Sequence, residues 1–247
     1  MTPADLAAAP DSTRFILVNT SHPGNVGATA RAMKVMGFSE LVLVAPRFAD
    51  VLCQEDTVAM ASGAADILAR ARIVPSLAEA LEGVQIACAT AMTPRDFGPP
   101  TRAPRDCFAE LALRREKVAF VFGSERYGMS NDDVRRCHVC LSIPTHPDYG
   151  SLNLAQAVQL LAYDWRCALG GYGVTPRTRA PQRASIDAVE GALEHWREAL
   201  VEIGFLDPQA PKKLMPRLEQ LLHRAELTAE EVHILRGMAR AVLAGRR

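Results

Sequence analysis

Short apolar runs recur through the first two thirds of the chain, and each is long enough for one buried strand. They fall at Phe15–Val18, Leu41–Val44, Ile73–Val74, Val84–Ala89, Val118–Phe122 and Val139–Ile143. Segments with apolar residues at helical spacing lie between or after them, at Val26–Met36, Thr57–Arg70, Leu77–Leu81, Cys107–Arg115 and Leu152–Leu169. Strands that are apolar on both faces and alternate with helices are typical of a mainly parallel sheet with helices on both faces. The pattern therefore predicts one α/β domain over residues 14–169.

The apolar pattern changes after residue 169. Glycine and proline interrupt any periodicity over residues 170–184, a composition typical of a linker. Residues 185–247 show only helical spacing, and a unit of this size is too small to bury a good core alone. We therefore predict a small helical C-terminal extension that packs on the main domain or on a second subunit. Residues 1–13, rich in alanine and proline, predict a flexible N-terminus.

Helix start signals support three helices in the extension. Ser185 is a candidate N-cap, and Pro216 suits the first turn of a second helix. Thr228 is followed three residues later by Glu231, which is the signature of a capping box at the start of a third helix.

Composition narrows the class of protein. With 49% hydrophobic and 23% charged residues, the chain has the make-up of an ordinary globular protein. Its 28 basic and 28 acidic residues cancel, which argues against a strongly electrostatic nucleic-acid binder of the histone kind. The first dozen residues do not resemble a signal peptide, and no run reaches the length of a membrane span. We expect a cytoplasmic protein with neither a membrane nor DNA as partner.

The six cysteines are scattered through the expected strands and helices, which suits reduced, buried thiols better than a disulfide framework. Cys137 and Cys140 have the spacing of half a zinc site. No second pair of ligands completes that site, so we expect no metal.

Three of the expected strands lead into polar loops, at strand-to-loop junctions over residues 19–31, 120–128 and 143–153. Glycine, asparagine, glutamate and arginine gather there, and the first and third segments lead into helices. Free backbone N–H groups at such junctions are preferred ligand sites in open α/β folds. The first segment lacks the G-x-G-x-x-G spacing of a dinucleotide loop, and the chain contains no P-loop motif. The three junctions predict a ligand site of another kind.

Arg31 is the main polar residue on a helix face with the small residues Gly27, Ala28 and Ala30. Small neighbours would let another chain or a substrate backbone come close to the guanidinium. The alternative is a surface arginine in a structural ion pair.

The segment after the fifth apolar run contains two glycines and two charges. Gly123 would allow a ligand to approach the backbone, and Gly128 is expected to close a turn. Glu125 and Arg126 either face solvent or, on a loop leaving a central strand, contribute to a site.

A proline-rich stretch over residues 93–104 reads as a long loop. The stretch contains or adjoins three arginines, Arg95, Arg102 and Arg105. It is either a functional loop, acting as a lid or contacting RNA, or a solvent-exposed loop without a role in the site.

Taken together and in this order, the motifs resemble those of the SPOUT-class RNA 2′-O-methyltransferases (SpoU/TrmH superfamily), and within them the TrmJ type of tRNA enzyme. The first motif corresponds to Asn25–Ala32, the second to Phe122–Gly128 and the third to Ser151–Ala155. The tail over residues 214–224 and 231–237 also resembles the helical extension of that type. The likeness covers nearly the whole chain.

This resemblance implies an α/β trefoil knot, S-adenosylmethionine as cofactor, and a homodimer whose active site lies at the subunit interface. It implies transfer of a methyl group to a ribose 2′-hydroxyl, with cytidine or uridine 32 of the tRNA anticodon loop as the expected target. The residues that it places around the cofactor are Thr90, Ala91, Met92, Gly123, Ile143, Gly150, Ser151 and Leu152.

The residues expected at the reaction centre are Arg31, Asn25, Glu125, Ser151 and Asn153. A guanidinium is essentially always protonated, so we expect Arg31 to stabilise the developing oxyanion or a neighbouring phosphate rather than to act as a base. The other four would position the ribose, Arg31 or a water that accepts the proton.

The residues expected to contact RNA are Arg95, Arg102, Arg105, Arg126, Lys212 and Lys213. Ser124 and Gly150 depart from the motifs typical of the TrmJ type, which leaves the preferred nucleotide open. Two alternatives remain: a ribosomal RNA methyltransferase of the same class, and a catalytically silent RNA-binding protein.

Overall fold

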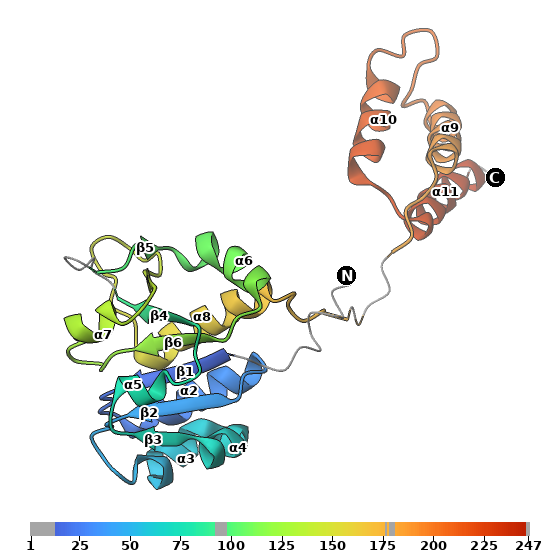
Figure 1. The fold of residues 1–247 in the computed structure, drawn as a ribbon. Coiled ribbons are helices and arrows are strands. Elements are labelled where there is room, and N and C mark those ends of the chain that lie inside the picture. The colour runs from blue at the N-terminus through green and yellow to red at the C-terminus, as the bar shows by residue number, and fades with distance from the viewer. Residues whose placement is uncertain (1–12, 92–97, 176, 178–180, 246–247) are drawn as a thin grey trace. The chain divides into compact units, whose positions relative to one another are not determined.

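The computed structural model describes residues 13–91, 98–175, 177 and 181–245. These residues form two compact units, one ending at Gly173 and the other beginning at Val174 (Figure 1). Within the described ranges, no helix combines the length and the apolar character needed to cross a membrane.

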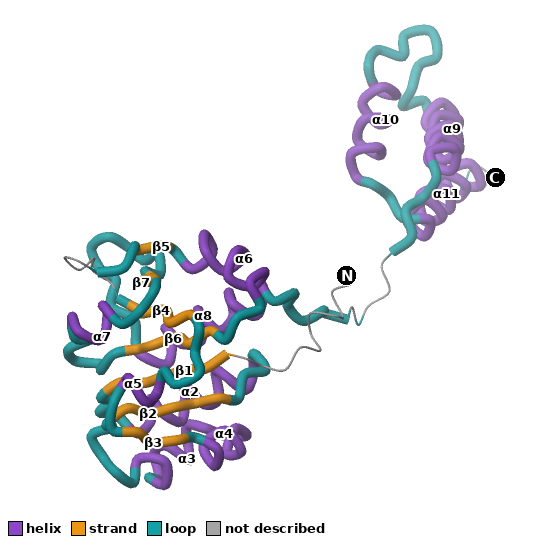
Figure 2. The backbone as a smooth tube through the Cα atoms, viewed as in Figure 1, coloured by secondary structure: helices purple, strands orange, loops and turns teal. Residues whose placement is uncertain are grey.

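A seven-stranded parallel sheet forms the centre of the first unit (Figure 2). The strand order is β3-β2-β1-β6-β4-β7-β5, and every pairing is parallel. The strands are β1 (Thr13–Val18), β2 (Glu40–Val44), β3 (Arg72–Val74), β4 (Ile86–Thr90), β5 (Thr101–Arg102), β6 (Val118–Phe122) and β7 (Val139–Leu141). The central strands β1 and β6 are buried along their whole length, as their unbroken apolar runs predict.

Helices cover both faces of this sheet, which confirms the predicted α/β architecture. They are α2 (Pro23–Val35), α3 (Glu55–Ala61), α4 (Ala65–Arg70), α5 (Leu77–Ala80), α6 (Pro104–Arg114), α7 (Asn131–Arg135) and α8 (Leu154–Ala168). Alternate residues of each strand face opposite sides: Phe15 joins the larger apolar core with α2, α3, α4, α6 and α8, whereas Ile16 joins the smaller core with α5 and α7.

The strand order is interleaved. β6 lies between β1 and β4, and β7 lies between β4 and β5, so that later strands enter between strands formed earlier in the chain. A simple consecutive winding would place each new strand at an edge.

Four features depart from the predicted elements. The single helix predicted over residues 57–70 is two helices, α3 and α4, because Ser62 adopts a left-handed conformation (φ 52°) and a short 3-10 turn, η2 (Ser62–Ala64), separates them. A second 3-10 turn, η1 (Val51–Cys53), precedes α3. The loop predicted over residues 93–104 contains the edge strand β5 among its described residues. Helix α7 was not predicted, because its five residues are too few to show a periodic pattern.

The second unit contains α9 (Ile186–Glu202), α10 (Leu214–Ala225) and α11 (Ala229–Ala244), which pack around a small apolar cluster including Val189, Leu193 and Val232. The capping box predicted at Thr228 is present at the start of α11. Ser185 occupies the N-cap position of α9, but its side chain makes no capping hydrogen bond.

Both ends of the predicted linker are held by hydrogen bonds. At its start, the Tyr172 hydroxyl donates to the Met36 carbonyl over 3.4 Å, and the Arg166 guanidinium stacks on the Tyr172 ring. Arg166 Nε also donates to the same carbonyl over 2.7 Å, so the end of α8 is tied to the end of α2. At its far end, Ala184 N–H donates to the Leu227 carbonyl over 2.8 Å, within the helical unit.

Gly27 is required by the close approach of α2 to α3. A Cβ atom at this position would lie 2.0 Å from the Thr57 carbonyl oxygen. Ala30, on the same helix, is fully buried in the larger core. The expectation that Gly27 and Ala30 form an open face beside Arg31 was therefore wrong, because both residues face inward, and only Ala28 and Ala32 line the surface next to Arg31.

Candidate functional site

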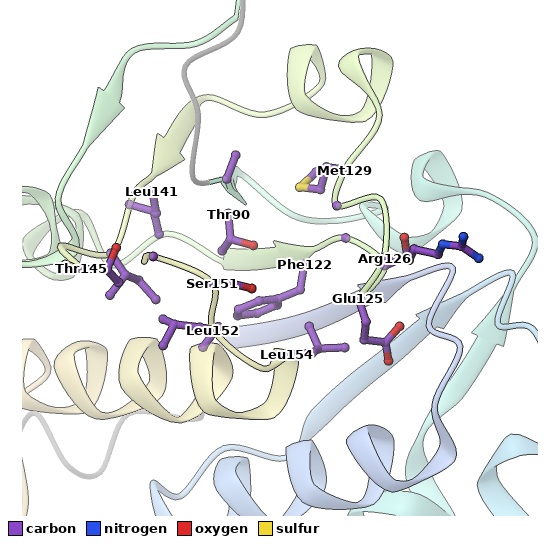
Figure 3. Close-up of a pocket in the computed structure, with 17 residues that line it drawn as sticks. Thr90, Phe122, Glu125, Arg126, Met129, Leu141, Thr145, Ser151, Leu152 and Leu154 are labelled. Carbon is purple, nitrogen blue, oxygen red and sulfur yellow. The ribbon is translucent and has the colours of Figure 1, made fainter. Parts of the chain in front are cut away.

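The carboxyl ends of β4, β6 and β7 surround a cavity of about 340 Å³ (Figure 3). The start of α8 closes one side of it. Cavities of this size at the strand ends of an open parallel sheet are the usual place for a small-molecule ligand.

Seven of the eight residues predicted around a cofactor line this cavity. They are Thr90, Ala91, Gly123, Ile143, Gly150, Ser151 and Leu152. The eighth, Met92, lies outside the described residues. Sequence reasoning missed several other apolar residues of the lining, which include Phe122, Leu141, Met129 and Leu154. An apolar residue at the last position of a strand looks the same in sequence whether it faces the core or a ligand.

A tight turn over Ser124–Gly128 forms the wall next to β6. Ser124 N–H donates to the Gly128 carbonyl over 3.1 Å, and Gly128 N–H donates back over 2.8 Å. Gly128 has φ +67°, which confirms the predicted turn. A Cβ atom on Gly123 would lie 2.1 Å from the Gly128 carbonyl carbon. Gly123 is therefore required by the chain's own turn, before any ligand is considered.

The Glu125 carboxylate is the most heavily hydrogen-bonded group of the site. Its Oε1 accepts from the Thr20 hydroxyl (3.0 Å), His22 N–H (3.3 Å) and Asn25 Nδ2 (2.9 Å). Its Oε2 accepts from both the backbone N–H and the hydroxyl of Ser21, each over 2.9 Å. In Figure 3 the carboxylate points away from Thr90 and Leu141, toward the ribbon of the first helix. The loop after β6 is thus joined to the junction between β1 and α2.

These donors hold Glu125 in its charged form. Partial burial alone would raise the pKa of this carboxyl, but the hydrogen bonds from Asn25 and Ser21 outweigh burial and lower the pKa to about 2. A carboxylate that is so weakly basic and already accepts five hydrogen bonds is a poor proton acceptor. Glu125 therefore acts on the position of its neighbours.

Asn25 connects Glu125 to the start of α8 by hydrogen bonds. Its Oδ1 accepts from Asn153 Nδ2 over 2.9 Å, while its own amide group donates to Glu125. The Asn153 Oδ1 accepts from Ala155 N–H over 2.9 Å, and Gln156 completes a capping box with Asn153. A chain of side chains, Glu125 to Asn25 to Asn153, therefore connects three polar segments that are far apart in sequence.

A second, more open hollow lies on the other side of the hydrogen-bonded side chains Glu125, Asn25 and Asn153. Asn25 and Asn153 line it together with Arg31, and so do Gln156 and Gln159. Arg31 is exposed, and among the residues that the structure describes it has no acidic partner. The five predicted reaction-centre residues are thus distributed over two adjoining hollows, with Ser151 and Glu125 at the first and Arg31 at the second.

The predicted RNA-contacting residues differ in their surroundings. Arg126 lies at the rim of the first cavity, with its guanidinium 5.3 Å from the centre of the Tyr127 ring. Arg102 pairs with Glu110 over 3.1 Å, and Arg105 pairs with Asp164 over the same distance. They belong to β5 and α6, so the expectation that both lie on a long loop was wrong.

The two predicted lysines of the tail, Lys212 and Lys213, are exposed immediately before α10. Arg95 lies outside the described residues.

The Cys137 and Cys140 side chains are buried in the smaller core, and Cys140 belongs to β7 itself. Burial raises the pKa of the Cys137 thiol to about 12. Between them, His138 Nδ1 accepts a hydrogen bond from Ala87 N–H over 3.1 Å, which joins this segment to β4. Within the described ranges, no three metal-binding side chains converge.

Comparison with known proteins gives two family matches. Residues 12–163 match the SpoU rRNA Methylase family, and residues 187–247 match the C-terminal domain of tRNA methyltransferase TrmJ.

Full-length relatives are similar over both parts of the chain. The tRNA (cytidine/uridine/adenosine-2′-O-)-methyltransferase TrmJ of Pseudomonas aeruginosa is 42% identical over 240 residues, which cover 92% of each chain. The tRNA (cytidine/uridine-2′-O-)-methyltransferase TrmJ of Pectobacterium atrosepticum is 39% identical over 94% of this chain and 97% of its own. The crystal structure of TrmJ from Z. mobilis ZM4 superposes with a TM-score of 0.79 at 30% identity, covering 93% of this chain and 98% of that one.

The hydrogen bonds of Glu125 generate a pH-dependent prediction. Glu125→Gln is expected to lower the free energy of unfolding at pH 7 by about 1–3 kcal/mol, because an amide cannot accept the same set of hydrogen bonds. The carboxylate has a lowered pKa in the folded state, so its contribution is present above the ordinary value of 4.5 and is lost as the pH falls toward 2. Urea unfolding of both proteins at pH 7 and pH 3 measures this, and their difference should be smaller at pH 3. The exposed Glu82→Gln is the matched control, and a deficit independent of pH would contradict the assignment.

Proposed function

Because the chain belongs to the SpoU rRNA Methylase family and carries a TrmJ C-terminal domain, we propose that it methylates the ribose 2′-hydroxyl of cytidine or uridine 32 in a tRNA anticodon loop. S-adenosylmethionine would be the methyl donor. The observation that carries the proposal is the pair of adjoining hollows, which share the wall formed by Glu125, Asn25 and Asn153. A donor site and an acceptor site need this adjacency, since a methyl group is transferred directly between them.

The lining of the first cavity fits the proposed donor. Phe122, Leu141 and Leu152 offer apolar contact, while Thr90, Thr145 and Ser151 bring hydroxyl groups to its edges. Gly123 and Gly150 add backbone groups to the lining. The Thr90 hydroxyl donates to the Val121 carbonyl over 3.0 Å, which fixes the end of β4 against β6 beneath the cavity. When bound, S-adenosylmethionine supplies an activated methyl group, so the protein's main task is alignment.

Alignment would come from the rigid wall, and charge from Arg31. Holding two reactants in the right geometry can contribute on the order of 7–11 kcal/mol to a barrier. Arg31, permanently protonated and without an acidic partner in the described part of the chain, would stabilise the developing 2′-oxyanion or bind the adjacent phosphate. Glu125 would not accept the hydroxyl proton because of its lowered pKa, so we assign that step to water in the open hollow.

The proposal includes a homodimer whose second subunit covers the hollow that contains Arg31. Exposed Val35 and Met60 line the same hollow, so this surface mixes apolar side chains with the arginine. Burying such side chains against a partner is favourable. Light scattering under assay conditions should therefore give twice the mass of one chain, and a monomer that methylates RNA at full rate would contradict this part of the proposal.

The direct experiment is transfer of a labelled methyl group to purified RNA. We expect label in bulk tRNA, recovered as 2′-O-methylcytidine or 2′-O-methyluridine after digestion, and lost when position 32 is changed to a 2′-deoxy nucleotide. Label in ribosomal RNA alone would favour the related rRNA activity. Binding of tRNA without any methyl transfer would favour a catalytically silent protein.

The role of Arg31 can be separated from donor binding. Arg31→Ala is expected to lower kcat at least about 100-fold, the usual effect of removing a group that stabilises transition-state charge. Calorimetry should show the affinity for S-adenosylmethionine changed less than about twofold, because Arg31 does not line the first cavity. The exposed Arg70→Ala is the matched control. Lost donor affinity with full turnover at saturating donor would contradict the role given to Arg31.

A further inference from the structure

Arg47 is an exposed arginine to which the proposed function assigns no role. It lies in the loop after β2, with its side chain exposed and its guanidinium 5.2 Å from the centre of the Phe48 ring. Within the described ranges it has no acidic partner. Asp50, the acidic residue next along the loop, accepts instead from the Gln54 amide over 3.0 Å. A free, permanently charged group is therefore held on an aromatic face.

The backbone fixes Arg47 beside the reaction centre. Its N–H donates to the Thr20 carbonyl over 3.0 Å, and the Thr20 hydroxyl donates to Glu125 over 3.0 Å. The strands β2, β1 and β6 are consecutive neighbours in the sheet. With a spacing of about 4.8 Å between strands, the ends of β2 and β6 are about 10 Å apart, on either side of the start of α2.

The chain turns sharply to reach this position. Ala45, between β2 and Arg47, has φ +42°, a left-handed conformation that costs an alanine free energy. Ala45 N–H donates to the Val74 carbonyl over 2.9 Å, and this bond holds the turn in place. The neighbouring strand end repeats the arrangement at Asn19, with φ +52° and an N–H that donates to the Val44 carbonyl. Maintained strain of this kind concentrates at functional sites.

Arg126 presents the same arrangement on the other side of α2. It stacks on Tyr127, the next residue in sequence, as Arg47 stacks on Phe48. Some other arginines of this unit are paired with carboxylates, as Arg102 is with Glu110 and Arg105 with Asp164. A guanidinium stacked by its face keeps its N–H groups free along its edge, and these groups match the oxygens of a phosphate.

We propose that Arg47 binds a backbone phosphate of the RNA near the methylated ribose, with Phe48 holding the guanidinium in position. Arg47 and Arg126 would contact phosphates on the two sides of the ribose. The inference rests on the proposed function, because it takes the RNA substrate as the ligand. Contacts to phosphate fix the register of the RNA without reading its sequence.

The test is a salt titration of tRNA methylation by Arg47→Ala. We expect KM for tRNA to rise about tenfold with kcat nearly unchanged, and the slope of log(kcat/KM) against log salt to fall by about 1, the effect of one lost phosphate contact. Arg47→Lys should keep the slope, whereas Phe48→Leu should keep the slope and raise KM less than Arg47→Ala. Arg70→Ala is the control, since Arg70 precedes β3 and so lies at the amino ends of the strands, away from the carboxyl ends where the hollows lie.

The outcomes separate this inference from the proposed function. If wild-type protein methylates tRNA but Arg47→Ala matches Arg70→Ala in KM and in salt slope, Arg47 does not bind phosphate. If wild-type protein methylates no RNA, the proposed function fails by itself. Fluorescence anisotropy of labelled tRNA at several salt concentrations then tests Arg47 directly, and equal slopes for wild type and Arg47→Ala would overturn the inference.

Discussion

The rest of the site depends on one carboxylate, Glu125, and on the five hydrogen bonds that it accepts from Thr20, Ser21, His22 and Asn25. A parallel sheet brings the ends of β1 and β6 side by side, but the loops that follow could take many conformations. Glu125 selects one of them by satisfying the free N–H groups at the start of α2. Without this acceptor those donors would have to find water, and Asn25 would lose the bond that orients its amide toward Asn153.

The hydrogen bonds to Glu125 also give the negative and positive groups of the site different surroundings. The negative group becomes part of the scaffold, whereas Arg31, Arg47 and Arg126 have no carboxylate partner among the residues that the structure describes. Elsewhere on the same unit, Arg102 and Arg105 are paired with carboxylates. The net charge of zero conceals this arrangement, because a sum over the whole chain does not show which charges are already paired.

The sequence was most informative where a physical pattern is local. Unbroken apolar runs predicted the central strands, and the Thr228 capping box marks the start of α11. The cavity residues came from motif resemblance, since no local rule brings Thr90 beside Gly150. Gly27 and Gly123 were given to ligands or partners because sequence cannot reveal which backbone comes near a glycine, and in both cases it is the chain's own. Arg47 was missed because its possible role in binding follows only from the position of β2 next to β1 and from the absence of a nearby described carboxylate.

Helices α2 and α8 have a further consequence as a pair. Their starts are joined by the bond between Asn25 and Asn153, and their ends by the bond from Arg166 to the Met36 carbonyl. Two helices that are hydrogen-bonded to each other at both ends cannot slide past one another without breaking both sets of hydrogen bonds. We therefore expect α2 and α8 to keep their relative position when a ligand binds, so that little binding energy is used to align the side chains that they carry.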